Sequence, residues 1–548
     1  MKTVDAIIEI LQREKVEFLS CFPTTSVIDA AASVGMRPVI CRQERVGVGI
    51  ADGFARVTNG RRPAVFAMQY GPGAENAFAG VATAYSDSTP MLLIPLGQAS
   101  AIAGVPPIFS SEESYSAVTK WVERLDHPHR ISEVMRRAFS RVRHGKPGPV
   151  MVEFAADILD TDIGDAADGY EPVIATRSAA DPRDVLAAAR ALVEAERPVI
   201  FAGQGVMYAE ATDELVALAE LLQAPVVTTM LGKSAFPEDH PLSAGTAATV
   251  MSSLGYRAMA DSDVVLAVGA SLTRHPMSIT VPPGKTVIHA VNDEADLNKS
   301  YPAAYPILGD AKLTLAQFAE AVAEVRGTSA AVDNNVAADL AAQRDAWLAE
   351  WSPVLTSGET PINPYRVIHE MQRAIPPSEA IVTHDSGSPR DQMLPFYVAP
   401  TPRSYLGWGK SHGLGTGLGL TIGAKLAEPD KVCINVMGDA AFGMTGLDIE
   451  TAVRAEAPII TVVFNNGTMA IENRNMISSH ERYKARDLGG AYADIGRALG
   501  AHAERVADPE DVGPAFQRAR RVTEDQGQAV VLEFMTSAET RFSHRRAL

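Results

Sequence analysis

The stretch that decides the fold is Val432–Glu472, VCINVMGDAAFGMTGLDIETAVRAEAPIITVVFNNGTMAIE. An apolar run, VCINVM, leads into the small-residue turn Gly438–Ala441, and a second apolar run, IITVVF, leads into Asn465–Thr468. We interpret the two runs as buried strands, so that Asp439 leaves the end of the first and Asn466 leaves the end of the second. In a parallel α/β layer both side chains reach the same carboxyl edge, where open sheets bind ligands. The stretch therefore predicts a parallel sheet with a ligand site at this edge.

The polar residues of this edge predict a metal site. A carboxylate, an amide oxygen and a backbone carbonyl are hard oxygen ligands, and Mg²⁺ takes about six of them, usually completed by phosphate oxygens and water. Asp439, Asn466 and the carbonyl of Thr468 supply three such ligands. We therefore predict that these three residues hold Mg²⁺.

The small residues of the turn predict a phosphate site beside the metal. Gly438, Ala440 and Ala441 carry little or no side chain, so backbone N–H groups can approach phosphate oxygens there. We also expect a helix to begin near Met444 and to direct its positive end at the same oxygens. Together with the metal ligands, the turn predicts an anion site closed by a metal ion.

GDAAF and the later VVFNNGT resemble the GDG…NN signature of thiamin diphosphate (ThDP) enzymes. This superfamily includes acetolactate synthase, pyruvate oxidase, benzoylformate decarboxylase and pyruvate decarboxylase. The resemblance implies ThDP and Mg²⁺ as cofactors, and it adds Met469 to the cofactor-binding residues. Ala440 stands where the family has its second glycine, and an alanine there would be strained if the position needed a positive φ. We expect a φ that alanine tolerates.

Glu44 lies in RQERVGVGIADGFAR, between a strand that ends at Cys41 and a helix rich in small residues. In ThDP enzymes a glutamate at this place, followed by a helix with an ADGYAR-like sequence, hydrogen-bonds the aminopyrimidine ring and promotes the imino tautomer that removes the C2 proton. Ala51–Arg56, ADGFAR, matches that helix closely. The resemblance therefore implies that Glu44 activates the cofactor. The alternative is a solvated glutamate that the helix dipole favours at a helix start.

Three further segments of the first 170 residues resemble active-site segments of the family. Gln69 precedes a GPG turn and stands where benzoylformate decarboxylase-like enzymes carry a histidine, so it could supply hydrogen bonding but no acid–base group. Thr25 follows Phe22-Pro23-Thr24, where the family often has a substrate-contacting residue; its alternative role is to cap the following helix. The loop from Pro106 to Leu125 resembles the family's entrance loop. These residues form the predicted substrate side.

The glycine-rich turn SHGLGTGLGL precedes another helix signal. In the family this turn contacts the aminopyrimidine through backbone carbonyls, and a bulky apolar residue props the cofactor into a V shape. The resemblance places that prop at Leu414, with Gly413 and His412 beside it. His412 is the histidine that we expect near the cofactor, and its alternative role is to cap the turn.

Glu472 is the predicted acid of the substrate side. It stands where pyruvate decarboxylase-like enzymes carry a glutamate that manages protons, whereas acetolactate synthases usually have an apolar residue there. A carboxyl group in an apolar pocket has a raised pKa and can act as a general acid near neutral pH. The alternative is an exposed glutamate at a helix start, among the polar neighbours Asn473, Arg474 and Asn475.

The length of 548 residues is too great for one hydrophobic core and indicates three domains. Helix and strand signals alternate along the chain, which is typical of βαβ units around parallel sheets. We predict three doubly wound parallel-sheet domains of the ThDP-dependent decarboxylase type. By the resemblance, residues 1–170 form a pyrimidine-binding domain, 180–325 a central domain, 326–361 a linker with a connecting helix, and 362–548 a diphosphate-binding domain.

The composition restricts partners and location. A net charge of −17 argues against nucleic acid or an anionic membrane as the main partner. Three cysteines in apolar contexts argue against a disulfide framework and favour a reducing compartment. No apolar run approaches the roughly 18–20 residues that span a bilayer, and the N-terminal segment has the pattern of an amphipathic helix rather than a signal peptide. We therefore expect a cytoplasmic enzyme.

The resemblance implies cleavage or formation of a carbon–carbon bond in a small carbonyl substrate, by a 2-keto acid decarboxylase or an acetolactate synthase-like carboligase. One alternative is a 2-hydroxyacyl-CoA lyase or oxalyl-CoA decarboxylase-like enzyme, with the basic C-terminus, RFSHRRAL, binding the coenzyme A ester. Another is a flavin-dependent pyruvate oxidase-like enzyme. A bare G-x-G in FAGQG and Arg274 leave FAD or ADP in the central domain open, although we do not favour it.

Because the family places the equivalents of Glu44 and of the Asp439–Thr468 segment on different subunits, the resemblance also implies a homodimer or homotetramer. The active sites would then lie at the subunit interface.

Overall fold

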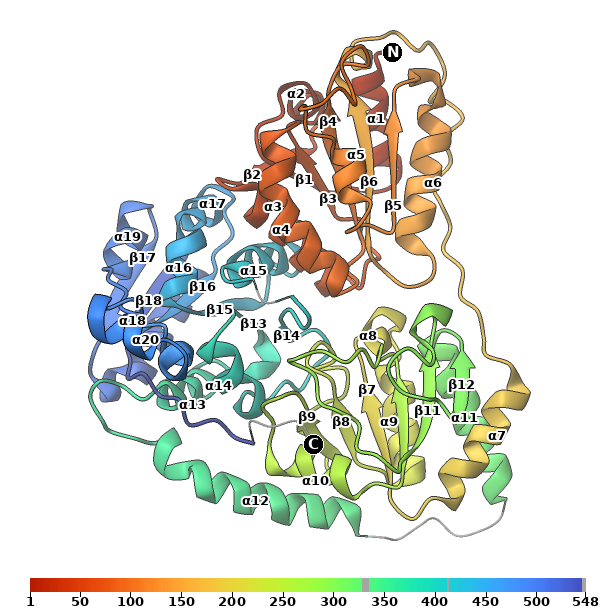
Figure 1. Ribbon diagram of the computed structural model, residues 1–548. Helices are drawn as coiled ribbons and strands as arrows, with labels where there is room; N and C mark the ends of the chain where they lie inside the picture. The colour runs from red at the N-terminus through yellow and green to blue at the C-terminus, as the bar shows by residue number, and fades with distance from the viewer. Residues whose placement is uncertain (328–334, 412, 545–548) are drawn as a thin grey trace.

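The computed structural model describes residues 1–327, 335–411 and 413–544, and it contains three six-stranded parallel sheets with helices on their faces (Figure 1). This architecture confirms the predicted fold class of three doubly wound α/β domains. Most strands are apolar at consecutive positions, because helices cover both faces of a parallel sheet.

The N-terminal sheet has the strand order β2-β1-β3-β4-β6-β5. Its strands are β1 Phe18–Cys21, β2 Arg37–Ile40, β3 Val65–Met68, β4 Met91–Gly97, β5 Trp121–Leu125 and β6 Pro149–Ala155. Its helices are α1 Thr3–Arg13, α2 Thr25–Ser33, α3 Glu44–Val57, α4 Pro72–Ser86, α5 Ser111–Tyr115 and α6 Ile131–Arg143. The prediction of a loop from Pro106 to Leu125 was wrong from Ser111 on, because this part holds α5 and β5. The strand β5 lies at the sheet edge and is only half-buried, so its sequence WVERL lacks the apolar run of an inner strand.

The central sheet has the order β12-β11-β10-β7-β8-β9. Its strands are β7 Pro198–Ala202, β8 Val226–Thr228, β9 Ser243–Thr246, β10 Val264–Val268, β11 Thr286–Val291 and β12 Tyr305–Leu308. Its helices are α7 Pro182–Glu194, α8 Gly205–Ala209, α9 Thr212–Leu222, α10 Ser253–Asp261 and α11 Ala311–Arg326. The long helix α12, Val336–Leu355, then runs beneath the central domain toward the third domain (Figure 1).

The C-terminal sheet has the order β14-β13-β15-β16-β18-β17. Its strands are β13 Ala380–His384, β14 Tyr405–Leu406, β15 Val432–Gly438, β16 Ile460–Asn465, β17 His502–Val506 and β18 Val530–Met535. Its helices are α13 Pro364–Ala374, α14 Ser388–Phe396, α15 Thr416–Ala427, α16 Asp439–Thr445, α17 Ile449–Arg454, α18 Ile477–Tyr483, α19 Tyr492–Ala498 and α20 Val512–Asp525. The two strands of the deciding stretch, β15 and β16, are parallel neighbours near the middle of this sheet, as the sequence predicts.

The N-terminal and C-terminal domains meet where α3 crosses α15 (Figure 1). Glycines bring the two backbones together: a Cβ atom added at Gly53 would lie 2.1 Å from the carbonyl oxygen of Leu420, and one added at Gly423 would lie 2.1 Å from that of Ile50. Buried apolar side chains of both helices, such as Phe54 of α3, belong to one continuous core. Because Glu44 is the first residue of α3 and the 413–415 turn precedes α15, this crossing positions two predicted site segments.

Candidate active site

A cavity of about 320 Å³ lies at the carboxyl edge of the C-terminal sheet. It is bounded by the ends of β13, β15, β16 and β18 and by the segments that follow them. The lining includes Ser386, Leu414, Asp439, Asn466, Met469 and Glu472. Predicted metal, diphosphate, prop and acid residues thus surround one space.

Asp439 connects the ends of the two central strands. Its carboxylate accepts hydrogen bonds from the backbone N–H groups of Ala440 and Gly467, each at 2.8 Å. Burial raises the pKa of this carboxyl group, and the backbone N–H donors oppose the rise. Among the described residues, no basic side chain forms an ion pair with Asp439. A bound cation would therefore supply the positive charge that this buried carboxylate lacks.

Asn466 and Thr468 complete the predicted metal set. The side-chain oxygen of Asn466 accepts a hydrogen bond from the backbone N–H of Thr468 at 3.0 Å, and both residues are half-buried beside the cavity. Within the described ranges there is no cluster of three or more His, Cys, Asp or Glu side chains that would suit a softer metal. One carboxylate, one amide oxygen and one carbonyl fit Mg²⁺ whose remaining ligands are phosphate and water.

The phosphate side of the cavity contains the beginnings of two helices. α16 begins directly at Asp439, so the predicted start near Met444 was wrong. The helix dipole stabilises an aspartate in the first turn, which favours the earlier start. Ala440 therefore lies inside a helix and has no positive φ, as expected. The second helix, α14, follows Gly387, whose φ is +90°.

Sequence reasoning missed the segment Ser386–Ser388, which lines the same cavity. A usable signal was present, because the turn HDSGSP combines a glycine with a proline in the first turn of the following helix. The segment places the N-terminus of a nine-residue helix beside the phosphate side.

Glu44 begins α3 and is buried. The side-chain amide of Asn76 donates a hydrogen bond to its carboxylate at 3.2 Å, and burial raises the pKa of the carboxyl group. The neighbouring Arg45 donates to the carbonyl of Leu414, which lines the cavity. The contact of Arg45 thus brings the start of α3, where Glu44 lies, to the 413–415 turn. Both segments belong to the same chain.

The 413–415 turn has a defined backbone. The hydroxyl of Thr416 donates to the carbonyl of Gly413 at 2.9 Å, and Gly415 has a φ of +84°, which favours glycine. Leu414 is half-buried and faces the cavity as the predicted prop. His412 lies outside the described residues.

Glu472 lies at the rim of the cavity, in a short 3₁₀ helix, Ala470–Arg474. Its carboxylate accepts a hydrogen bond from the side chain of Asn475 at 3.1 Å, and the side chain is half-buried. The expectation of an enclosed apolar pocket was therefore wrong. Glu472 contacts both the cavity and solvent, so it can exchange protons with water.

One other predicted substrate residue does not line this cavity, and a second has a side chain that the structure does not describe. Gln69 is exposed at the end of β3 and does not line the space. Thr25 begins α2, and its side chain is outside the described part of the structure. Both stay predictions.

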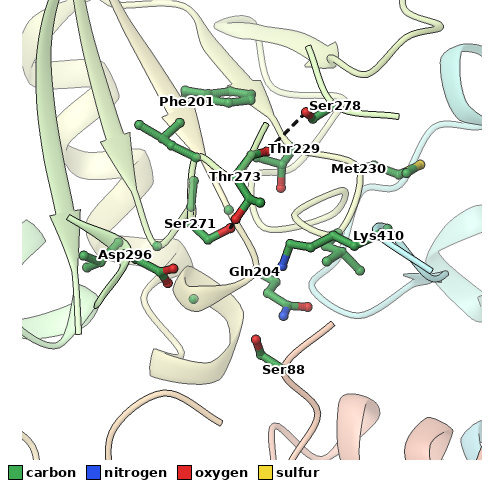
Figure 2. Close-up of a pocket in the computed structure, with 18 of the residues that line it drawn as sticks. Ser88, Phe201, Gln204, Thr229, Met230, Ser271, Thr273, Ser278, Asp296 and Lys410 are labelled. Carbon is green, nitrogen blue, oxygen red and sulfur yellow. Dashed lines mark hydrogen bonds between the residues drawn. The ribbon is translucent and has the colours of Figure 1, made fainter. Parts of the chain in front are cut away.

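A second cavity, of about 130 Å³, lies where the three domains meet (Figure 2). Gly203 and Gly205 of the G-x-G segment line it, and Gln204 and Lys410 extend into it, as Figure 2 shows. Ligand pockets are typically about 300–1,000 Å³, and Gly205 also lines an adjoining cavity of about 900 Å³ between the N-terminal and central domains. Arg274 is not among the lining residues, and its guanidinium lies over the ring of Tyr301.

No helix in the described ranges is both long and apolar enough to cross a membrane.

The sheets, the carboxylate–amide pair at one end of the main cavity and the buried glutamate beside its other end define an α/β enzyme for a diphosphate-bearing cofactor. Family models bear this out: the thiamine pyrophosphate enzyme N-terminal TPP binding domain matches residues 1–121, the central domain 185–318 and the C-terminal TPP binding domain 385–534. The chain belongs to the thiamine pyrophosphate enzyme family. This membership confirms the predicted class, a ThDP-dependent enzyme of the carboligase or lyase type.

Relatives match along most of the chain. A sulfoacetaldehyde acetyltransferase from Alcaligenes xylosoxydans xylosoxydans is 30% identical over 96% of this chain and 91% of its own length. A probable acetolactate synthase large subunit from Methanocaldococcus jannaschii is 28% identical over 95% and 90%. The acetolactate synthase isozyme 3 large subunit of Escherichia coli is 28% identical over 80% and 77%. The similarity therefore includes all three domains.

Proposed function

We propose that this chain is a Mg²⁺- and ThDP-dependent enzyme that cleaves a small 2-keto acid and transfers the acyl part to a second small acceptor, as an acetolactate synthase-like carboligase or an acetyltransferase. The observation that carries the proposal is the placement of the buried carboxyl of Glu44 beside the 413–415 turn, next to the cavity that also contains Asp439 and Asn466. The names of the relatives, acetolactate synthase and sulfoacetaldehyde acetyltransferase, support the reaction class.

The residues at the sheet edge fit the cofactor. Asp439, Asn466 and the carbonyl of Thr468 would hold Mg²⁺, and the N–H groups that begin α14 and α16 would hold the diphosphate. When bound, ThDP supplies a nucleophilic carbon and an electron sink, which is the chemistry that breaking or forming a bond next to a carbonyl requires.

Glu44 and Glu472 would carry out different proton transfers, Glu44 at the cofactor and Glu472 at the substrate. Burial raises the pKa of the Glu44 carboxyl group, and the side-chain amide of Asn76 orients that group. Glu472 stands at the substrate rim, where it can deliver a proton to a carbon or oxygen of the substrate and recover one from water. Leu414 fills the space between the two ends of the site.

The coenzyme A ester alternative loses part of its support. The backbone carbonyl of Arg541 accepts a hydrogen bond from Tyr365 at 2.6 Å, and the guanidinium of Arg541 lies over Trp351. The Ser543 hydroxyl accepts a hydrogen bond from Trp347 at 3.1 Å. These contacts give the described part of the basic C-terminus a packing role between α12 and α13. The proposal also contains no FAD or ADP.

We further propose a cytoplasmic homodimer or homotetramer with active sites at the subunit interface. Met444 and Leu447, next to the diphosphate side, are 51% and 59% exposed, and Tyr85 on α4 is 44% exposed. Large apolar side chains beside a functional site are typical of a face that a partner covers. The three cysteines are buried and free, as expected for a reducing compartment.

The test is an assay of purified protein with ThDP and Mg²⁺ on pyruvate, benzoylformate, branched 2-keto acids and 2-hydroxyacyl-CoA esters, with and without an aldehyde acceptor. We expect keto-acid consumption that rises with acceptor, and a loss of at least about 100-fold in Glu44→Gln. Glu75→Gln, which changes an exposed glutamate on α4, is the matched control and keeps the activity. Cleavage of the CoA esters alone would overturn the keto-acid proposal.

A further inference from the structure

Asp385 is a fully buried carboxylate at the end of β13, and sequence reasoning assigned it no role. One carboxylate oxygen accepts hydrogen bonds from the backbone N–H groups of Ser386 at 2.7 Å and of Gly415 at 2.8 Å. The other accepts one from Gly417 at 2.9 Å. Asp385 therefore binds backbone on both sides of the cavity, although the segments are 30 and 32 residues away along the chain.

The two segments that Asp385 joins belong to opposite ends of the site. Ser386 begins the segment that leads into α14 and lines the phosphate side. Gly415 ends the turn that meets Glu44's helix, and Gly417 lies in the first turn of α15. A Cβ atom at Gly417 would lie 3.3 Å from the Asp385 carboxylate and 2.4 Å from the side chain of Asn435, so the turn is seated directly on this group.

Burying a carboxylate costs free energy unless hydrogen bonds offset the loss of water. Burial raises the pKa of Asp385, and the three backbone N–H groups oppose the rise. A buried carboxylate satisfied by N–H groups fixes their positions more tightly than neutral partners would, because charge-assisted hydrogen bonds are shorter and stronger.

We propose that Asp385 is a positioning residue that couples the two ends of the cofactor site. Through Ser386 it is tied to the place where the diphosphate end is held, and through Gly415 and Gly417 it sets the turn that faces Glu44. Binding at the phosphate side should therefore steady the turn across the cavity. The inference rests on the proposed function, since it needs a ligand that reaches both ends.

The first test compares Asp385→Asn with Asp263→Asn. Asp263, in the central domain, also accepts three backbone N–H bonds, from Glu196 at 2.7 Å, Arg197 at 3.0 Å and Val264 at 2.9 Å, so it is a matched control. Tryptophan fluorescence of cofactor-free protein measures the affinity for ThDP and for inorganic pyrophosphate, each with Mg²⁺. We expect Asp385→Asn to weaken ThDP binding by about tenfold and pyrophosphate binding by a smaller factor, while Asp263→Asn changes neither. Unchanged ThDP binding, or an equal loss for both ligands, would overturn the inference.

The second test needs no variant and holds even if Asp385→Asn does not fold. Hydrogen–deuterium exchange of peptides spanning residues 413–418 in wild-type protein is followed with and without pyrophosphate and Mg²⁺. We expect slower exchange at the Gly415 and Gly417 amides, although pyrophosphate fills only the other end. Unchanged exchange overturns the coupling, whereas failure of the wild-type protein to bind ThDP at all would overturn the proposed function itself.

Discussion

The carboxylate of Asp448 accepts a hydrogen bond from the backbone N–H of Arg42 at 2.8 Å, across the boundary between the C-terminal and N-terminal domains. Asp448 follows α16, and Arg42 stands two residues before Glu44. The same carboxylate oxygen accepts a bond from the hydroxyl of Thr451 at 2.8 Å. The segment that carries Glu44 is thus held by a buried acid of the opposite domain.

The pH dependence of stability should include Asp448. Burial raises its pKa from 3.8 to about 6, so its contribution is fully present below pH 3.8 and is lost as the pH rises through about 6. Asp448→Asn, which stays neutral, should flatten the decline of the unfolding free energy between pH 5 and 7.5 by about 1.4 kcal/mol. Urea unfolding at several pH values measures it. Glu456→Gln, an exposed change in the same domain, should keep the wild-type slope, and an unchanged slope in Asp448→Asn would refute the assignment.

Stabilisation by the cofactor should depend on Asp439. At a ThDP concentration about 100 times its Kd, with Mg²⁺, the wild-type protein should gain about 2.7 kcal/mol of stability. Asp439→Asn should show little of this gain, because the buried carboxylate is the one full charge of the predicted metal set. Thermal unfolding with ThDP plus Mg²⁺ or plus EDTA measures it. Asp430→Asn, an exposed change just before β15, serves as the control, and a wild-type gain in Asp439→Asn would contradict the metal set.

The helix crossing should not tolerate a methyl group. Gly53→Ala places Cβ 2.1 Å from the Leu420 carbonyl oxygen, so the two backbones must separate, at a cost of about 2 kcal/mol or more. Gly443→Ala is the same change inside a helix with open space around it, and it should be neutral or stabilising. Denaturant unfolding of both variants checks the contrast. Equal stabilities would show that α3 and α15 do not pack this closely.

The acid at the rim should act on turnover rather than on cofactor binding. Glu472→Gln should lower kcat by about 10²- to 10⁴-fold and leave ThDP affinity unchanged, because the Glu472 carboxylate pairs with Asn475 rather than with a residue of the predicted metal set. Steady-state kinetics and cofactor titration separate the two effects. Glu481→Gln, an exposed change on α18, should leave both unchanged. A parallel loss of affinity and turnover would assign Glu472 to the cofactor side instead.

Residues next to strand ends could be predicted from sequence because local pattern fixes them. Asp439 and Asn466 follow apolar runs, and parallel strands carry them to one edge whatever the rest of the chain does. Asp385 also follows a strand, but its proposed role depends on hydrogen bonds to glycines 30 and 32 residues away. The spacing of residues in a sequence does not indicate such a contact. The rim position of Glu472 likewise depends on tertiary packing.

Edge strands could not be predicted from the sequence either. β5 is half-buried and polar, and β14 has only two residues, so neither shows the apolar run that reveals β15 or β16. The crossing of α3 and α15 could be anticipated only in part: small residues in both helices indicate close packing, but not which helix meets which.

The contact between Arg45 and Leu414 closes a loop of 369 residues. Loops of this length form slowly during folding, since chain entropy opposes contacts between segments so distant in sequence. Each sheet can form from its own neighbouring strands, whereas the site exists only after the first and last domains have docked. In refolding experiments, secondary structure should therefore return well before ThDP binding. The rate at which catalytic activity returns then measures the last step of folding, the docking of the first and last domains.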